Sequence, residues 1–348
     1  MIDFLFVSVL AGFMAALLAW GFRTLPNERW QMIAAVPIAK ERDGDWRGMN
    51  LTFYGFFSAS GSIVGIAIAV LLLASLHVSL VMAILLVAGM LLLCLPASRL
   101  VAAVVEKKRN TYTIAGAAFV AALLLPVLIW LGARYLPAWG LTLPATPTLA
   151  AATIAYALAE AIGRLACLSF GCCYGMPVRE ASPGLARLFR RFHTVFHGET
   201  KKAAYASGLQ EEPLIPVQAM TSIIFAISGI IGLAFFLAQY WRVAALVPMI
   251  GTWGWRAIAE NLRADHRGHT KISAYQVMSI IAMAYLVVAG LILPATGAAP
   301  DIAFGLAEMA NVGVILVLQC LWVLLFLFYG RSQVTASVVS FHVVMERT

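Results

Sequence analysis

Apolar runs of about 20 residues recur along almost the whole chain, and they restrict the fold more than any other feature. A run of this length crosses a bilayer as an α-helix, whereas the alternating strands of a membrane barrel would not be so continuously apolar. Only 11% of the 348 residues are charged, which excludes an ordinary soluble domain. The sequence therefore predicts an all-α polytopic membrane protein with nine spans, at 3–22, 51–76, 78–105, 111–136, 148–170, 214–240, 243–263, 272–294 and 305–329.

The segments between the runs suggest three parts. Residues 1–50 are expected to hold an extra N-terminal transmembrane helix and an interfacial segment that carries Trp30 and Trp46. Residues 51–294 would form a seven-helix membrane core, with a small head domain at 171–213, and residues 295–348 an extra C-terminal transmembrane helix and a tail. Because the first run lacks a basic leading segment and is long for a signal peptide, a retained helix is expected there.

The formal charge of +8 is unevenly placed. With the nine spans numbered in order, nearly all Lys and Arg residues fall on one side, and only Arg134 and Arg242 fall on the other. The positive-inside rule would place the basic side in the cytoplasm. We expect a multi-pass protein of a bacterial cytoplasmic membrane, with no nucleic-acid partner.

The stretch EAIGRLACLSFGCCYGMP places Glu160 and Arg164 four residues apart, so that both side chains can pair on one helix face. Charged side chains in a membrane span are costly, and they usually mark a function or an ion pair. Two interpretations are open: a structural pair that braces the bundle, or an arginine that holds an anionic headgroup. The glycines of the following turn, including Gly175, would allow close approach of a ligand to the backbone.

A second charged cluster, WGWRAIAENLRADHRGH, carries Arg256, Glu260 and Arg263 at helical spacing. It can be an ordinary basic helix end that meets lipid headgroups. Alternatively, the two clusters form one shared anion site, since the guanidinium fork matches phosphate oxygens.

The cysteines make no CxxC pair and no disulfide framework. The C-x4-C-C spacing of Cys167, Cys172 and Cys173 is not a standard zinc pattern, and we expect no metal ion and no other cofactor. Cys172 or Cys173 can be a covalent relay if a nearby arginine activates the thiol, or simply a small residue that fills a tight turn.

Taken in order, these pieces resemble the prolipoprotein diacylglyceryl transferase family. The family's Tyr-Gly is matched by Tyr54 and Gly55, its GRxGNFxNGExxG signature by residues 163–175, its HPxQLYE helix start by 215–218, and its late arginine by Arg263. The resemblance covers roughly residues 50–294. It implies an enzyme that moves the diacylglyceryl group of phosphatidylglycerol, or a similar anionic phospholipid, onto a thiol of a lipoprotein precursor.

The resemblance also implies roles for single residues. Arg164 and Arg263 would grip the phosphate, while Tyr54 and Gln218 would line the lipid cavity. This chain lacks four family residues: the signature Asn is Cys167, the signature Glu is Cys172, the family's Ser-Phe-His-Gly-Gly segment is Thr113–Ala117 without its histidine, and the His of the sixth-helix motif is Ile215. His266 and His269, close to Arg263 in sequence, are the nearest candidates for a general base.

Several functional classes therefore stay open. One is a transferase, with a secreted acceptor or, if the basic face is cytoplasmic, a cytosolic one. Another is a non-catalytic phospholipid carrier that kept the cavity and lost the chemistry. A small-molecule transporter is a third, although no inverted repeat of broken helices is visible.

Overall fold

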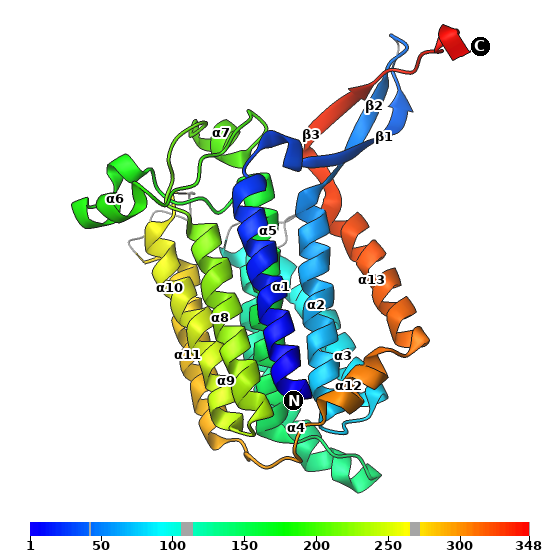
Figure 1. The fold of residues 1–348 in the computed structure, drawn as a ribbon, viewed down its shortest axis with the longest axis vertical. Helices are drawn as coiled ribbons and strands as arrows, with labels where there is room; N and C mark the ends of the chain where they lie inside the picture. The colour runs from blue at the N-terminus through cyan, green and yellow to red at the C-terminus, as the bar shows by residue number, and fades with distance from the viewer. Residues whose placement is uncertain (42, 106–113, 265–271, 348) are drawn as a thin grey trace.

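A computed structural model describes residues 1–41, 43–105, 114–264 and 272–347. The described part is mostly helical, and eight of its helices are long and apolar enough to cross a membrane. Figure 1 shows these helices running side by side as one bundle. The prediction of a helical, multi-pass membrane protein is confirmed. The eight helices are α1 (Ile2–Thr24), α2 (Phe53–Ser75), α3 (Leu80–Val105), α4 (Ile114–Tyr135), α5 (Ala145–Phe170), α8 (Val217–Leu237), α11 (Ala274–Ile292) and α13 (Val312–Gly330).

Helix α5 is the centre of the bundle, with α2 and α8 packed along it. Small residues allow the close crossing of α2 and α5. A Cβ atom added to Gly61 would lie 2.6 Å from the carbonyl oxygen of Ala159, and one added to Gly65 would lie 2.7 Å from the Ala159 side chain. Because lipid tails compete with apolar side chains, such backbone approach is a main source of helix association in membranes.

Replacing Gly61 by alanine is expected to destabilise the bundle by about 1–3 kcal/mol, because the backbone carbonyl opposite cannot rotate away from the added methyl group. Denaturation in mixed detergent micelles measures this change. Gly89→Ala in α3 is the matched control, since nothing lies within 4 Å of its added Cβ. Equal stability of the two variants would contradict the close crossing.

The seventh predicted span, 243–263, is not one α-helix, and this prediction needs correction. It consists of α9 (Trp241–Met249), a π-helical turn η4 (Ile250–Gly254), α10 (Trp255–Ala259) and a 3-10 turn η5 (Glu260–Leu262). Pro248 cannot donate a backbone hydrogen bond inside this segment, and the Thr252 hydroxyl bonds the Pro248 carbonyl at 2.7 Å. Short π-helical turns are frequent at functional sites, and this one ends two residues before Arg256.

The ninth predicted span is also divided, into α12 (Ile302–Met309) and α13. Asn311 separates the two helices, and its side-chain oxygen accepts a hydrogen bond from the Gly313 amide at 2.8 Å. An Asn at this position caps the start of the second helix.

A three-stranded antiparallel sheet was not predicted. It contains β1 (Met32–Lys40), β2 (Trp46–Thr52) and β3 (Arg331–Val339), in the order β1-β2-β3. The sheet takes the place of the expected interfacial segment and connects it to the C-terminal tail. In Figure 1 it projects beyond the bundle, at the end where α5 finishes.

The predicted head segment, 171–213, contains a 3-10 turn η3 (Val178–Glu180) and two short helices, α6 (Pro183–Phe189) and α7 (Lys202–Ser207). It lies at the same end of the bundle as the sheet (Figure 1). Polar contacts join it to the chain that follows α1 and to the end of α5. The Gln31 side-chain amide donates to the Thr200 carbonyl, and the Thr200 hydroxyl donates to Gln31 Oε1. Lys201 donates to the carbonyl oxygens of Leu25 and Ser169. Of the two arginines predicted on the sparsely charged side, Arg134 lies in the last turn of α4 and Arg242 lies in the first turn of α9.

Candidate functional site

The predicted ion pair between Glu160 and Arg164 is present on α5, with Arg164 Nη2 3.0 Å from Glu160 Oε2. Arg256 of α10 reaches the same carboxylate oxygen, at 2.7 Å. All three side chains are at least four-fifths buried, with exposed fractions of 15%, 16% and 10% for Glu160, Arg164 and Arg256. The structure thus joins the two charged clusters, but Arg256 faces Glu160 rather than Glu260.

Arg256 also lies against two aromatic rings. Its guanidinium carbon is 5.8 Å from the ring centre of Tyr156 and 5.5 Å from that of Trp253. The two rings are stacked on each other, with centres 6.1 Å apart. Cation–π contact of this kind stabilises a guanidinium that has lost part of its hydration.

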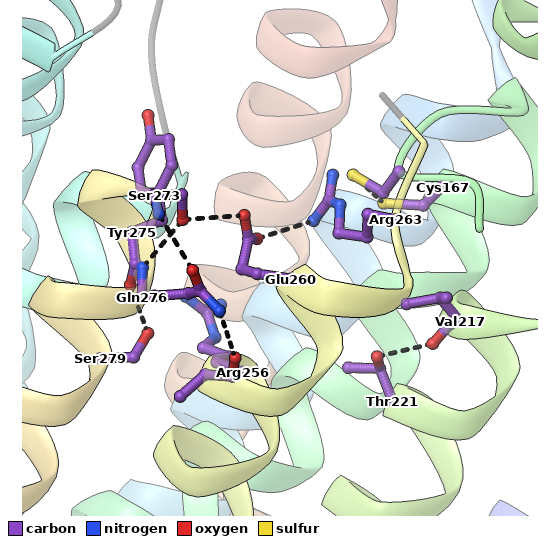
Figure 2. A network of polar contacts seen from close by, with 12 residues as sticks. Cys167, Val217, Thr221, Arg256, Glu260, Arg263, Ser273, Tyr275, Gln276 and Ser279 are labelled. Carbon is purple, nitrogen blue, oxygen red and sulfur yellow. Dashed lines mark hydrogen bonds and ion pairs between the residues drawn. The ribbon is translucent and has the colours of Figure 1, made fainter. Parts of the chain in front are cut away.

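Glu260 and Arg263 form the second predicted pair, at 3.5 Å, and both side chains are about nine-tenths buried. Ser273 at the start of α11 donates to Glu260 Oε2 at 3.3 Å (Figure 2). Ser273 and Gln276 form a capping box, and Gln276 also donates to the Ala257 carbonyl of α10. These bonds fix the end of α10 beside the start of α11.

The turn after α5 brings Arg263 close to the cysteines. Gly171 ends the helix in the left-handed conformation (φ 72°), and the chain then pairs with the segment after η5. Met176 donates to the Leu262 carbonyl at 2.9 Å, and Ala264 donates to the Tyr174 carbonyl at 3.1 Å. Arg263 therefore lies beside Cys167, as Figure 2 shows.

Gly175 and Gln218 support this turn. A Cβ atom on Gly175 would lie 2.3 Å from the Ile215 carbonyl oxygen, so the space beside this glycine is filled by backbone and not left for a ligand. Gln218 of α8 is buried, and its amide donates to the Cys172 carbonyl at 2.8 Å. Its other atom, Oε1, is buried and has no hydrogen-bond partner among the described residues.

The thiols of Cys167, Cys172 and Cys173 converge, with all three sulfur atoms within 4.8 Å of one another. Sequence spacing argued against such a cluster. Hydrogen bonds with Cys167 and Cys173, together with burial, raise the pKa of the Cys172 thiol well above its ordinary value. A thiol with a raised pKa is a weaker nucleophile near neutral pH than an ordinary cysteine.

Tyr54 lies at the first turn of α2, half-buried, with its ring 5.7 Å from that of Phe170 at the end of α5. It lies near the three cysteines and Arg164. The predicted residues Tyr54, Arg164 and Cys172 thus share one site. His266 and His269, the predicted candidates for a base, lie outside the described residues.

A largely apolar cavity of about 310 Å³ lies next to the arginines. Residues of α2, α3, α4 and α5 line it, among them Gly65, Leu86, Leu125 and Tyr156, together with Trp253 of the π turn. Tyr156 and Trp253 are also the rings that contact Arg256, so these two rings lie between the cavity and the charged cluster. A volume near 300 Å³ is at the lower end of ordinary ligand pockets.

Sequence reasoning did not identify Tyr156, Trp253 and Ser273. Tyr156 lies four residues before Glu160 and Trp253 lies three before Arg256, so helical spacing was the available signal. Ser273 could have been recognised from the Ser-x-x-Gln capping pattern with Gln276. Compared with known proteins, the chain matches no protein-family model and no curated protein sequence.

Proposed function

We propose that this protein binds an anionic phospholipid of the phosphatidylglycerol type and transfers its diacylglyceryl group to an acceptor thiol. The observation that carries the proposal is a cluster of three buried guanidinium groups, those of Arg164, Arg256 and Arg263, beside an apolar cavity. Glu160 and Glu260 lie among these arginines and pair with them. A phosphodiester would accept charge-assisted hydrogen bonds from such guanidinium groups.

The arrangement of the cavity supports a lipid rather than a small soluble anion. An acyl chain would occupy the apolar space between α2, α3, α4 and α5, while the phosphate would meet the arginines beyond Tyr156 and Trp253. The Nε atoms of Arg164 and Arg256 are buried without a hydrogen-bond partner among the described residues. Each could donate to a phosphate oxygen.

In the proposed reaction, the acceptor sulfur forms a bond to the glyceryl carbon that carries the phosphate. The bond between that carbon and the phosphate oxygen breaks, glycerol phosphate leaves with the electron pair, and the thiol proton passes to water. The arginines would stabilise the charge that develops on the leaving phosphate. The resemblance to prolipoprotein diacylglyceryl transferases supports this choice of donor and acceptor, the acceptor being a lipoprotein-precursor cysteine.

A non-catalytic lipid carrier is the second candidate, and a specific observation favours it. Glu160 and Glu260 are both paired with arginines, so neither carboxylate is available as a general base. The carrier and the transferase would share the lipid site and differ in turnover.

Replacing Arg164 by glutamine is expected to weaken phosphatidylglycerol binding at least tenfold, because one of the three guanidinium groups of the cluster is lost. Native mass spectrometry of the purified protein, with phosphatidylglycerol and phosphatidylcholine in competition, measures this. Arg242→Gln is the control, since Arg242 is exposed at the start of α9 and takes no part in the cluster. The wild type is then assayed for glycerol phosphate release in the presence of a cysteine peptide.

The two readouts separate the candidates. Selective lipid binding with thiol-dependent release of glycerol phosphate would support the transferase. Binding without release supports the carrier. Equal binding of both lipids, or no loss in Arg164→Gln, would rule out the anionic-lipid site itself.

A further inference from the structure

The three clustered cysteines come from one helix end and one turn. Cys167 lies on the last turn of α5, and Cys172 and Cys173 follow the left-handed Gly171. Cys173 itself has a positive φ of 57°, a conformation that costs energy for any residue with a Cβ atom. The turn is held by the hydrogen bonds from Gln218 to Cys172 and from the Cys172 amide to the Cys167 carbonyl at 3.1 Å. These hydrogen bonds hold the turn in a strained conformation, in which the thiols of Cys172 and Cys173 lie near Cys167 of α5.

The distances between the sulfur atoms fit a single metal ion. A Zn–S bond of about 2.3 Å places two tetrahedral ligand sulfurs roughly 3.8 Å apart. The Cys167 and Cys173 sulfurs are 3.9 Å apart, and the Cys172 sulfur lies within 4.8 Å of both. Small side-chain rotations would therefore bring all three sulfur atoms to the separation expected for tetrahedral zinc ligands.

We propose that Cys167, Cys172 and Cys173 bind a zinc ion as thiolates. Three sulfur donors select soft or borderline-soft metals, and zinc accepts three protein ligands while keeping a fourth position for water or substrate. Among the described residues, no carboxylate or histidine joins the group, so its donors are all sulfur.

The open position would take a thiol or thiolate. A thiol that coordinates zinc is deprotonated by the ion, which would supply an activated sulfur without a general base. This last step rests on the proposed transferase, whereas the zinc site itself depends only on the cysteine geometry.

The test begins with the metal content of the full-length protein, purified under reducing conditions and dialysed against zinc. Elemental analysis is expected to give about one zinc per chain. Cys167→Ser, Cys172→Ser and Cys173→Ser should each lower this severalfold. Cys94→Ser and Cys320→Ser are matched controls, because both cysteines lie in other helices outside the cluster.

A misfolded variant is distinguished by a second measurement. A strong chelator should lower the thermal midpoint of the wild type and of both control variants, and leave the three cluster variants unchanged. Cobalt replacing zinc should give the visible absorption of a tetrahedral thiolate site, and adding a cysteine peptide should shift it.

Failure of the zinc site can be told apart from failure of the lipid site, because the zinc experiment measures bound metal and the lipid experiment measures bound phospholipid and released glycerol phosphate. Zinc that stays bound in the triple Cys→Ser variant, preferential retention of cuprous copper, or a Cys167–Cys173 disulfide in the reduced preparation would each overturn the zinc site. Cobalt absorption that does not respond to the peptide would overturn the open position.

Discussion

Replacing Glu160 by alanine is expected to destabilise the folded protein by about 3–5 kcal/mol, the largest loss we predict for removal of a single carboxylate. The Glu160 carboxylate is the common partner of Arg164, at 3.0 Å, and Arg256, at 2.7 Å. Without it, two guanidinium groups remain buried beside each other with no negative charge between them. Their repulsion would separate α5 from α10 and disturb the packing of Arg256 on Trp253.

Unfolding of the purified protein in mixed detergent micelles measures the effect. Glu199→Ala is the control, because Glu199 is exposed in the head segment and its loss should change stability by less than about 0.5 kcal/mol. If Glu160→Ala were as stable as the control, the ion pairs of Glu160 with Arg164 and Arg256 would not stabilise the fold.

The same variant links stability to the proposed lipid. If a phosphodiester occupies the cluster, phosphatidylglycerol should restore part of the lost stability by supplying the missing negative charge, whereas phosphatidylcholine should restore less. Equal effects of the two lipids would contradict anion binding at the cluster, and would leave Glu160 with a structural role alone.

The helices of the bundle could be read from the sequence because each depends on a local property, a continuous apolar run of sufficient length. The pairing of Glu160 with Arg164 was predictable for the same reason, since four residues are one helical turn. The division of the seventh span was less accessible. It depends on Pro248, which has no backbone N–H, and on the hydrogen bond from the Thr252 hydroxyl to the Pro248 carbonyl, and the apolar pattern does not record either.

The sheet was missed because its pairing is not local. Strand β2 pairs with β3, which follows it by almost the whole length of the chain, so that Trp46 is the partner of Val339. Nothing near Trp46 in the sequence indicates that partner. The contact between Arg256 and Glu160 was missed in part for the same reason: both residues were recognised, but their pairing depends on the approach of α10 to α5.

The convergence of the three cysteines was not predicted, for a different reason. Zinc motifs are recognised by spacing, and C-x4-C-C does not match a common one. The two left-handed residues Gly171 and Cys173 fold the chain back on α5, which brings three sulfurs together in a way that spacing alone does not encode.

The folded protein is expected to gain stability between about pH 7 and pH 10, and Lys201 is the reason. Lys201 is fully buried in the head segment and donates to the carbonyl oxygens of Ser169, at 2.6 Å, and Leu25, at 3.1 Å. Burial lowers its pKa from 10.5 to about 7, and only Glu28 opposes this shift. A neutral amine has two hydrogens, enough to keep both bonds.

The direction of the effect follows from proton binding. The unfolded chain keeps an ordinary lysine pKa near 10.5, so between pH 7 and 10.5 it binds more protons than the folded protein does. Raising the pH through this window therefore favours the folded state. At about 1.4 kcal/mol per unit of pKa shift, the whole window is worth several kcal/mol.

Thermal unfolding of the wild type and of Lys201→Met at pH 6 and pH 9 isolates this contribution from other titrating groups. At pH 9 the variant should be less stable by about 1–3 kcal/mol, because the Leu25 and Ser169 carbonyls lose a donor. At pH 6 the difference should narrow or change sign, since the wild type then buries a charged amine and the variant does not. Lys40→Met, at an exposed position of β1, should follow the wild type at both pH values. Parallel pH profiles for the wild type and Lys201→Met would show that Lys201 stays charged in the folded protein, and that its two carbonyl bonds hold the head on α1 and α5 in the ammonium form.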